Sequence, residues 1–426
     1  MNTAPLSAVL TREDLSGRII REYGSPTYVY VADRLRENIH RTANAMRDGL
    51  SGFQLLYAIK ANQNPVLLRV MQESYPDLGV DCSSPGELQI ALNAGFDRDH
   101  LIYTGNYESR EDLEYVLATG IPVNFDDLTS YQRCREIGLP EIMSFRINPG
   151  EGKGAYPGIT TAGKNVKFGV LRAKALEAYR MAIADGIQRF GLHTMVGSGI
   201  LDNDYFPWNC RRMLEIAREL ETSLDIQFEF IDMGGGFGIP YRETDTPLDT
   251  EKIFREVGEV VEEFYPGDSG PRMTYELGRY LVGDAGFILA TVTGIKENDQ
   301  YFAGLDIGMN GFLRPALYGA YHRIIPLGNT EDRVTRITEI TGQICENTDR
   351  TARERKLPEL HPGDYVAIMD TGAYGFCFAS QYNGRPLPAE VLLDNDRSYL
   401  IRQRESLDDL NRNVIIPEPY DVQENR

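Results

Sequence analysis

Lys60, within the sequence YAIKAN, is the residue of this chain best placed for covalent chemistry. It closes a short apolar run, Leu55–Lys60, which is typical of a β-strand, so its side chain is expected at a strand end. A partly desolvated lysine in such a place can form a Schiff base with a carbonyl group of a substrate or a cofactor. Many lysines flank strands without any function, so a second feature has to support this one.

A glycine loop and a carboxylate provide that second feature. Gly234, Gly235 and Gly236 follow another apolar run and present backbone N–H groups that no side chain obstructs, which suits a phosphate, although such turns also occur with no ligand. YELGRY then places Glu276 and Arg279 at the next strand end. A carboxylate here can keep a proton on the pyridine ring of pyridoxal phosphate and make it a strong electron sink. A plain Glu–Arg ion pair is the alternative.

The elements that must position these residues alternate regularly from about residue 50 to about residue 280. Eight apolar runs are expected to be strands: Leu55–Lys60, Leu78–Ser83, Leu101–Gly105, Pro122–Asp126, Met143–Asn148, Gly191–Gly197, Phe228–Gly234 and Met273–Gly278. Amphipathic segments such as NPVLLRVMQESY separate them, which indicates parallel βαβ units. We therefore predict an α/β fold with a closed (β/α)8 barrel, whose chemistry lies at the C-terminal ends of the strands.

A second, β-rich domain is expected after the barrel. Beyond Arg279 the chain alternates in short apolar runs broken by Gly, Asn and Asp, such as GFILATVTGIKEN, VTRITEITGQI and DYVAIMDTG, which predict antiparallel strands of a sandwich or small barrel. The early run Thr27–Val31 is expected to join them. We predict a barrel over residues 32–280 and a second domain formed by residues 1–31 and 281–426.

Composition excludes several classes of protein. The 426 residues carry a formal net charge of −19, which argues against nucleic acid or an anionic membrane as partner. Neither a basic start followed by an apolar segment nor an apolar run of membrane-spanning length is evident, so the cytoplasm is the expected location. The five cysteines are scattered and form no CxxC pair, so neither a disulfide framework nor a metal site is predicted.

Taken in order, the motifs resemble the pyridoxal-phosphate decarboxylases of the alanine-racemase-like fold (group IV), and within them the branch that acts on diaminopimelate. The resemblance covers about residues 25 to 405 and rests on YAIKAN, VDCSSPGEL, FRINPG, KFGV, GGGFG, ELGR, RPALY, CENTD and DTGAYG through RPLPAEVLL. Each motif alone is weak, but the ordered set is specific.

The resemblance implies a role for each motif. Lys60 would hold pyridoxal phosphate, Glu276 would face its pyridine nitrogen, and Cys345 would protonate the carbon that loses carbon dioxide. The remaining cofactor-binding residues implied are Gly234, Gly235, Gly236, Leu277, Gly278, Arg279, Tyr374, Ser198 and Met195. The substrate-binding residues implied are Arg279, Arg314, Tyr318, Glu346 and Tyr374. In such enzymes the cysteine and its glutamate come from the neighbouring subunit, which implies a homodimer with shared active sites.

This sequence departs from the family pattern at two positions. The family usually has a ring-stacking histidine three residues before the serine, where this chain has Met195 three residues before Ser198, and His193 lies two residues earlier. If the strand continues, His193 points inward one layer lower. A methionine can pack its sulfur on an aromatic face but supplies neither a proton nor a charge. Leu277 also replaces the usual proline.

The function expected first is decarboxylation of meso-2,6-diaminopimelate to L-lysine and carbon dioxide, the last step of lysine biosynthesis, by a carboxy-lyase. Two arginines and a tyrosine suit a substrate that ends in an amino-acid head group, whereas the bare ammonium of ornithine or lysine would be repelled. A related amino acid or a carrier-bound substrate is the first alternative. A racemase of this fold predicts an arginine at the pyridine nitrogen, so Glu276 counts against it, and a cofactor-binding protein without catalysis is the last alternative.

Overall fold

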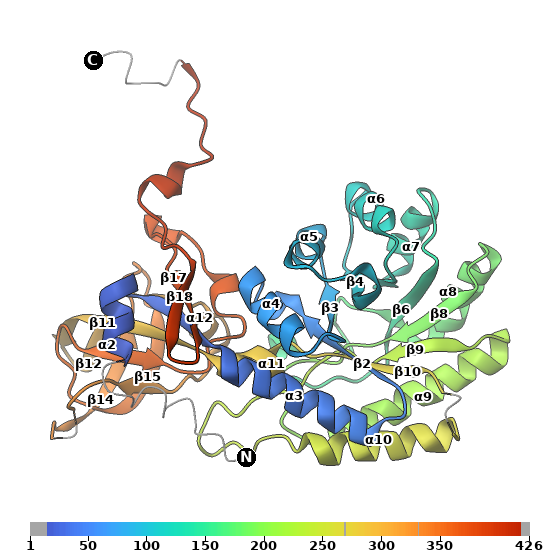
Figure 1. The fold of residues 1–426 in the computed structure, drawn as a ribbon, viewed down its shortest axis with the longest axis horizontal. Coiled ribbons are helices and arrows are strands. Elements are labelled where there is room, and N and C mark those ends of the chain that lie inside the picture. Colours follow the sequence, from blue (N-terminus) through green and yellow to red (C-terminus); the bar gives the residue numbers. More distant parts are fainter. Residues whose placement is uncertain (1–14, 268–269, 331, 419–426) are drawn as a thin grey trace.

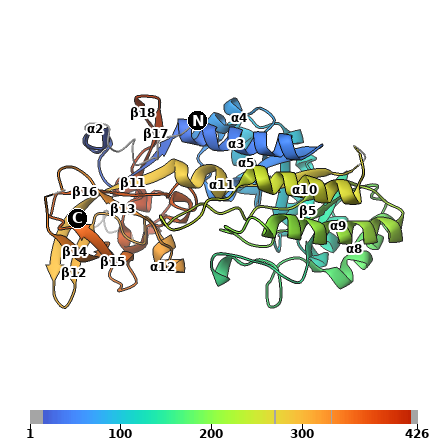
Figure 2. The same ribbon diagram turned by 90° about the horizontal axis from the view of Figure 1, so that it is seen from below.

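The computed structural model describes residues 15–267, 270–330 and 332–418. Within these residues the chain forms two lobes that lie next to each other along the long axis of the molecule (Figures 1 and 2). One lobe is a barrel wrapped in helices, and the other is built on a mixed β-sheet. The predicted fold class is confirmed.

The barrel consists of eight parallel strands that close on themselves. They are β2 (Phe53–Ala58), β3 (Gly79–Cys82), β4 (Leu101–Gly105), β5 (Val123–Phe125), β6 (Ile142–Asn148), β8 (Arg189–His193), β9 (Phe228–Asp232) and β10 (Arg272–Glu276). Pairing of β5 with β6 and of β10 with β2 completes the circle, and the two-residue β7 (Val170–Leu171) extends β6. The C-terminal ends of all eight strands therefore open on the same side of the barrel.

Helices surround this barrel on the outside (Figure 1). They are α3 (Ala32–Gly49), α4 (Pro65–Ser74), α5 (Pro85–Ala94), α6 (Arg110–Thr119), α7 (Leu128–Arg135), α8 (Arg172–Ala184), α9 (Tyr205–Leu224) and α10 (Thr250–Phe264). Polar caps fix several starts: Asn64 accepts the Val66 N–H, and Ser109 and Asp112 form a reciprocal capping box. In the described ranges, no helix combines the length with the apolar character that crossing a bilayer requires.

The second lobe gathers both ends of the chain into one sheet, whose main path runs β15–β14–β12–β11–β1–β17–β18. The strands are β1 (Thr27–Val31), β11 (Gly286–Glu297), β12 (Tyr301–Leu305), β13 (Ile324–Pro326), β14 (Thr335–Thr341), β15 (Arg350–Pro358), β16 (Tyr365–Ile368), β17 (Ala389–Asp394) and β18 (Arg397–Arg402). β1 lies between β11 and β17, so the early apolar run joins this lobe as predicted. The expectation of antiparallel strands is wrong for two pairs, because β1–β17 and β12–β14 run parallel.

The domain limits stay a prediction. The chain passes directly from β1 into α3 and from β10, through the short helix α11 (Arg279–Val282), into β11. The proposed limits of 32–280 for the barrel and of 1–31 with 281–426 for the second domain are compatible with these crossings. Residues 1–14, 268–269, 331 and 419–426 lie outside the described residues.

All eight predicted barrel strands exist, and nearly all ends agree within two residues. The predicted strand Leu55–Lys60 ends at Ala58, and Lys60 lies in a one-turn 3-10 helix, Ile59–Ala61. This turn is closed by a hydrogen bond from the Asn62 N–H to the Ile59 carbonyl. Lys60 therefore stands just beyond the strand, at the barrel mouth.

The largest error concerns the predicted strand Gly191–Gly197, which ends at His193. The Thr194 N–H still bonds to the carbonyl of Asp232, but the Met195 carbonyl accepts the hydroxyl of Thr161 at 2.9 Å instead of a ladder bond. Met195 therefore lies in the loop that leaves the barrel. The period-two argument that placed it directly above His193 in one strand does not apply.

Candidate active site

Lys60 meets a buried carboxylate at the barrel mouth. Its Nζ lies 2.8 Å from Oδ2 of Asp81, which β3 places in the barrel with no exposed surface. Burial lowers the pKa of Lys60, but Asp81 and Glu276 outweigh this and raise it above the ordinary value. Burial and Glu276 raise the pKa of Asp81 to about 6, although Lys60 lowers it. The lysine side chain is 36% exposed, so a charged amine held by Asp81 faces the solvent-accessible mouth.

The glycine loop follows β9 and leaves no room for side chains. A Cβ on Gly235 would lie 2.3 Å from the carbonyl oxygen of Glu276, and one on Gly234 would lie 2.5 Å from that of Thr194. Gly234 and Gly236 also have φ values of +64° and +106°, which other residues rarely adopt. Glycine is therefore required by close packing as well as by backbone conformation.

Met195, predicted to bind the cofactor, lies against this loop, and Ser198, for which the same is predicted, contacts Arg279. The Gly235 N–H points at the Met195 sulfur, with 3.2 Å between N and Sδ. Ser198 Oγ accepts an N–H of Arg279 at 3.2 Å. The loop therefore offers backbone N–H groups beside a hydroxyl and a guanidinium, which are donors suited to a phosphate.

Gly235→Ala tests this loop directly. The added Cβ forces the backbone to move, so we expect the affinity for pyridoxal phosphate to fall by about tenfold or more, the loss of one or two phosphate hydrogen bonds. Gly52→Ala is the matched control, because a Cβ there meets nothing within 4 Å. Titration of the apoprotein with the cofactor measures both. Wild-type affinity in Gly235→Ala would show that the loop does not bind the phosphate.

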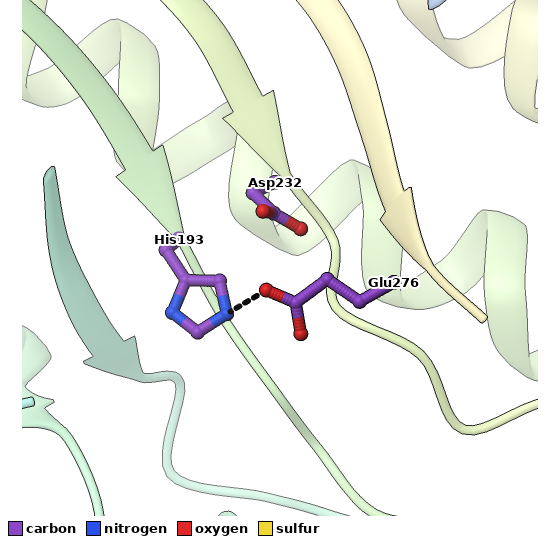
Figure 3. A group of neighbouring side chains, drawn as sticks. All are labelled: His193, Asp232 and Glu276. Atoms are coloured by element: carbon purple, nitrogen blue, oxygen red, sulfur yellow. Dashed lines mark ion pairs between the residues drawn. The ribbon is translucent and has the colours of Figure 1, made fainter. Parts of the chain in front are cut away.

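Glu276 closes the site from β10 and has two buried neighbours. His193 Nε2 lies 3.3 Å from Oε1 of Glu276, and Asp232 lies beside them at the end of β9 (Figure 3). Burial raises the pKa of Glu276, but His193 and Lys60 overcome this and lower it to about 2. Glu276 is therefore an ionised carboxylate in a nearly water-free barrel interior.

Two buried arginines converge on one tyrosine. Arg279 and Arg314 each donate an N–H to the hydroxyl of Tyr241, at 2.7 and 2.9 Å. His322 accepts a second contact from Arg314 at 2.8 Å and donates its other ring N–H to the carbonyl of Met369. Burial and Arg314 lower the pKa of His322 well below its ordinary value, which agrees with a neutral acceptor. Within the described residues neither guanidinium has a carboxylate partner, so the pair is prepared for an anionic ligand.

Tyr374 joins the lysine and arginine parts of the site. Its backbone N–H bonds to the carbonyl of Ala61, next to Lys60, and its ring lies 4.8 Å from the guanidinium carbon of Arg279. Burial raises the pKa of Tyr374, against the lowering by Arg279 and Lys60. The phenol is therefore neutral and can donate a hydrogen bond at the mouth.

Two further predicted residues take less direct positions. Tyr318, in helix α12 (Arg314–Tyr318), stacks on Tyr156 at 5.9 Å between ring centroids and stands at the rim. The side chain of Leu277 is buried in the core, and a Cβ on Gly278 would press on Ala61.

Cys345 and Glu346 are not brought to this site within one chain. Both are exposed, and their described partners are Asn383, which contacts the Cys345 sulfur, and Tyr382, whose hydroxyl bonds to Glu346. Glu346 also lines a cavity of about 470 Å³ formed by β11, β12 and the residues that follow β14. No barrel residue lines that cavity.

Several residues of the site were missed in the sequence. They are Asp81, Arg146, Asp232, Tyr241 and His322. Asp81 and Asp232 occupy barrel strand ends, the same signal that identified Glu276, and could have been found by it. Tyr241 follows the glycine loop and His322 follows RPALY in the sequence. Only the folded structure shows that they contact Arg279 and Arg314.

The residues present fit pyridoxal phosphate. A reachable amine, a cradle of glycine N–H groups and an ionised carboxylate whose buried Oε1 has no hydrogen-bond partner match the aldehyde, phosphate and pyridine nitrogen of that molecule. The barrel with this site defines a pyridoxal-phosphate enzyme.

Comparison with known proteins gives the family. Residues 36–283 match the model described as "Pyridoxal-dependent decarboxylase, pyridoxal binding domain". The chain is 41% identical to the diaminopimelate decarboxylase of Methanothermobacter thermautotrophicus over 93% of both chains, and 39% identical to that of Thermoplasma acidophilum over 93% of this chain and 94% of that one. The solved diaminopimelate decarboxylase of M. jannaschii in complex with L-lysine superimposes with a TM-score of 0.87 at 29% identity, covering 95% of each chain. The chain belongs to the pyridoxal-dependent decarboxylases.

Proposed function

We propose that this enzyme decarboxylates meso-2,6-diaminopimelate to L-lysine. The observation that carries the proposal is the pair of buried guanidiniums, Arg279 and Arg314, which converge on Tyr241 without a carboxylate partner in the described part of the chain. A substrate with a second amino-acid head group brings a carboxylate to such a pair, whereas ornithine or lysine would bring an ammonium. The names of the similar proteins, and the L-lysine bound to one of them, support the same substrate.

The protein residues divide the chemical work. When bound, the cofactor supplies an electron-poor ring that accepts the electron pair left by departing carbon dioxide. Lys60 would hold it by its amine, and Asp81, at 2.8 Å, is placed to take up the proton that the amine must lose. Glu276, kept ionised, would stabilise the protonated pyridine nitrogen. Burial of Asp81 and Glu276 strengthens their electrostatic interactions.

We infer that a second copy of the chain completes the site. Cys345 and Glu346 are exposed on the surface of the β-rich lobe. Tyr382, whose hydroxyl bonds to Glu346, is also 42% exposed. The thiol next to the Lys60 turn is that of Cys377, whose Sγ lies 3.7 Å from the carbonyl of Ala61, whereas Cys345 and Glu346 lie away from it. A homodimer that brings the Cys345 loop of one subunit to the barrel of the other would supply both.

We also infer that the enzyme works in the cytoplasm. All five cysteines are unpaired in the structure. Free thiols are typical of a reducing compartment, which supports the location expected from the N-terminal sequence.

A substrate panel tests the proposal. The purified enzyme with pyridoxal phosphate is supplied in turn with meso-diaminopimelate, L-lysine, L-ornithine and L-arginine, and carbon dioxide release is measured. We expect kcat/KM for diaminopimelate to exceed that for each of the others by about a hundredfold or more, because the others bring a cation to two buried cations. Equal or higher kcat/KM with any of them would refute the assignment of the substrate.

Arg314→Gln should separate the substrate from the cofactor. Removal of a buried charged partner costs about 2 to 5 kcal/mol, so kcat/KM for diaminopimelate should fall by roughly 30- to 4000-fold while the cofactor absorbance is retained. Arg336→Gln, which removes a partly exposed pair with Glu359, is the control and should leave kcat/KM within about twofold. Unchanged KM and kcat in Arg314→Gln would place the distal carboxylate elsewhere.

A further inference from the structure

Three buried side chains form a cluster where three neighbouring barrel strands end. His193 closes β8, Asp232 closes β9 and Glu276 closes β10, and one ligand atom of each lies within 4.8 Å of the others (Figure 3). His193 and Asp232 are fully buried, and Glu276 is 4% exposed. In the strand register His193 pairs with Asp232 and Asp232 pairs with Thr274, so Glu276 lies two residues further along β10, above the other two.

The contacts of the histidine are incomplete without Glu276. Its Nε2 is at ion-pair distance from Oε1 of Glu276, 3.3 Å, but no hydrogen bond of good geometry satisfies either ring nitrogen within the described residues. A fully buried imidazole with both nitrogens unsatisfied is costly in an apolar core. Glu276, which the imidazole of His193 faces, is therefore the group that compensates for this burial.

The surroundings of the two carboxylates in the cluster shift their pKa values in opposite directions. Burial and Glu276 raise the pKa of Asp232 well above its ordinary value, and one Asp232 oxygen accepts the Gly234 N–H at 2.9 Å. Burial and the nearby Glu276 carboxylate thus both disfavour the ionised form of Asp232, because two carboxylates this close resist ionising together. The negative charge is favoured on Glu276, whose pKa the neighbouring His193 lowers.

Three cations on other parts of the barrel also act on this cluster. Lys60 faces Glu276 from the turn after β2 but is bonded to Asp81, and Arg146 faces it from β6 but is paired with Asp126 at 3.1 Å. Arg272 acts on Asp232 from the other end of β10. Lys60 and Arg146, the two cations that act on Glu276, are thus each paired with another carboxylate, so neither replaces the histidine.

Met195 makes this arrangement necessary in this chain. Its thioether lies against Gly235 at the mouth and can neither accept a proton from the cofactor ring nor carry a charge. We propose that His193, the last residue of β8, is a positioning residue that keeps Glu276 ionised and oriented for the pyridine nitrogen of the cofactor. The proposal concerns cofactor binding and holds for any amino-acid substrate.

The test measures cofactor affinity, not activity. Apoprotein forms of the wild type, His193→Leu and His193→Gln are titrated with pyridoxal phosphate between pH 8.5 and 5.5, and the ratio of each variant's dissociation constant to that of the wild type is followed. Titration of the cofactor phosphate is common to all proteins and cancels in the ratio. His40→Leu, at a partly exposed contact with Ser74, is the control and should give a ratio near one throughout.

A charge-setting role predicts a ratio that depends on pH. Without the imidazole the pKa of Glu276 rises, so Glu276 gains a proton as pH falls and its attraction for the pyridinium is lost. The His193→Leu ratio should therefore grow by about tenfold between pH 8.5 and 5.5, the effect of one unit of pKa. His193→Gln keeps an N–H donor in place of the imidazole and should show a smaller rise in the same direction, so it tests the proposal if His193→Leu does not fold.

Two results would overturn the proposal. Ratios that are constant over the whole pH range in both variants would mean that His193 serves packing alone. The same three residues could also ligate a divalent cation, and one equivalent of bound metal in purified wild-type protein that is lost in both variants would assign the cluster to a metal instead.

Discussion

Replacing Lys60 with alanine is expected to abolish decarboxylation and to remove the visible absorbance of the bound cofactor. The amine of Lys60 is the group of this site that can form a Schiff base, and Asp81 beside it cannot form the same bond. Loss of a covalent catalytic group lowers kcat by a factor on the order of 10⁴ or more. Activity on diaminopimelate and the absorbance spectrum measure the two effects together.

Lys252→Ala provides the matched control for that experiment. Lys252 also pairs with an aspartate, Asp204, at 2.6 Å, but on the exposed surface. It should keep both activity and spectrum. If Lys60→Ala retained the cofactor absorbance and more than about one hundredth of the wild-type kcat, a different residue would have to hold the cofactor.

Mixing two inactive variants should restore activity if the sites are shared between subunits. Cys345→Ala removes the proposed proton donor and Lys60→Ala the cofactor anchor, and each alone should be nearly inactive. In a mixture that exchanges subunits freely, half of the dimers are hybrids, and each hybrid has one intact site formed by the unmutated Lys60 and the unmutated Cys345. About one quarter of the wild-type activity should return.

The mixing result depends on subunit exchange, so the mixture is unfolded and refolded together, and refolded wild type serves as the reference. Asn383→Ala, which removes a neighbour of the Cys345 sulfur without removing the thiol, should remain active on its own. Two outcomes would contradict the shared site: activity that never exceeds the sum of the two variants, or full activity of Cys345→Ala alone.

The sequence predicted the fold well because barrel strands are local signals. Each strand is a short apolar run, and the polar residue that follows the run marks the end of the strand. Lys60, the glycine loop and Glu276 were predicted in this way. The end of β8 at His193 was not predictable, since it depends on a carbonyl of another strand and on the loop contacts of Met195. Apolar residues continue past that point and hide the end of the strand.

The missed residues share one physical reason. Tyr241 contacts Arg314 across 73 positions of sequence, and His322 takes its place only because Arg314 and Met369 lie on either side of its ring. Such contacts are products of tertiary folding and leave no periodicity in the chain. The placement of Cys345 depends on a second molecule, which no pattern within one chain can position.

The methionine at the predicted ring-stacking position and the buried cluster of His193, Asp232 and Glu276 bear on the same property, the protonation of the cofactor ring. If Met195 takes the ring-stacking position, it places a thioether instead of a titratable group over the cofactor ring, while His193, at the end of β8, faces Glu276. Control of the ring's protonation would then come from within the barrel instead of from the face of the ring. The proposed substrate groups, Arg279 and Arg314, do not belong to the cluster of His193, Asp232 and Glu276.

The central claim is tested most directly by the products formed from meso-diaminopimelate. The purified enzyme with pyridoxal phosphate is allowed to consume a measured amount, and both carbon dioxide and L-lysine are quantified. The account predicts one molecule of each for every molecule consumed. Consumption without carbon dioxide, with a stereoisomer of diaminopimelate as the product, would contradict it and indicate a racemase, and bound cofactor without any consumption would contradict the proposed substrate.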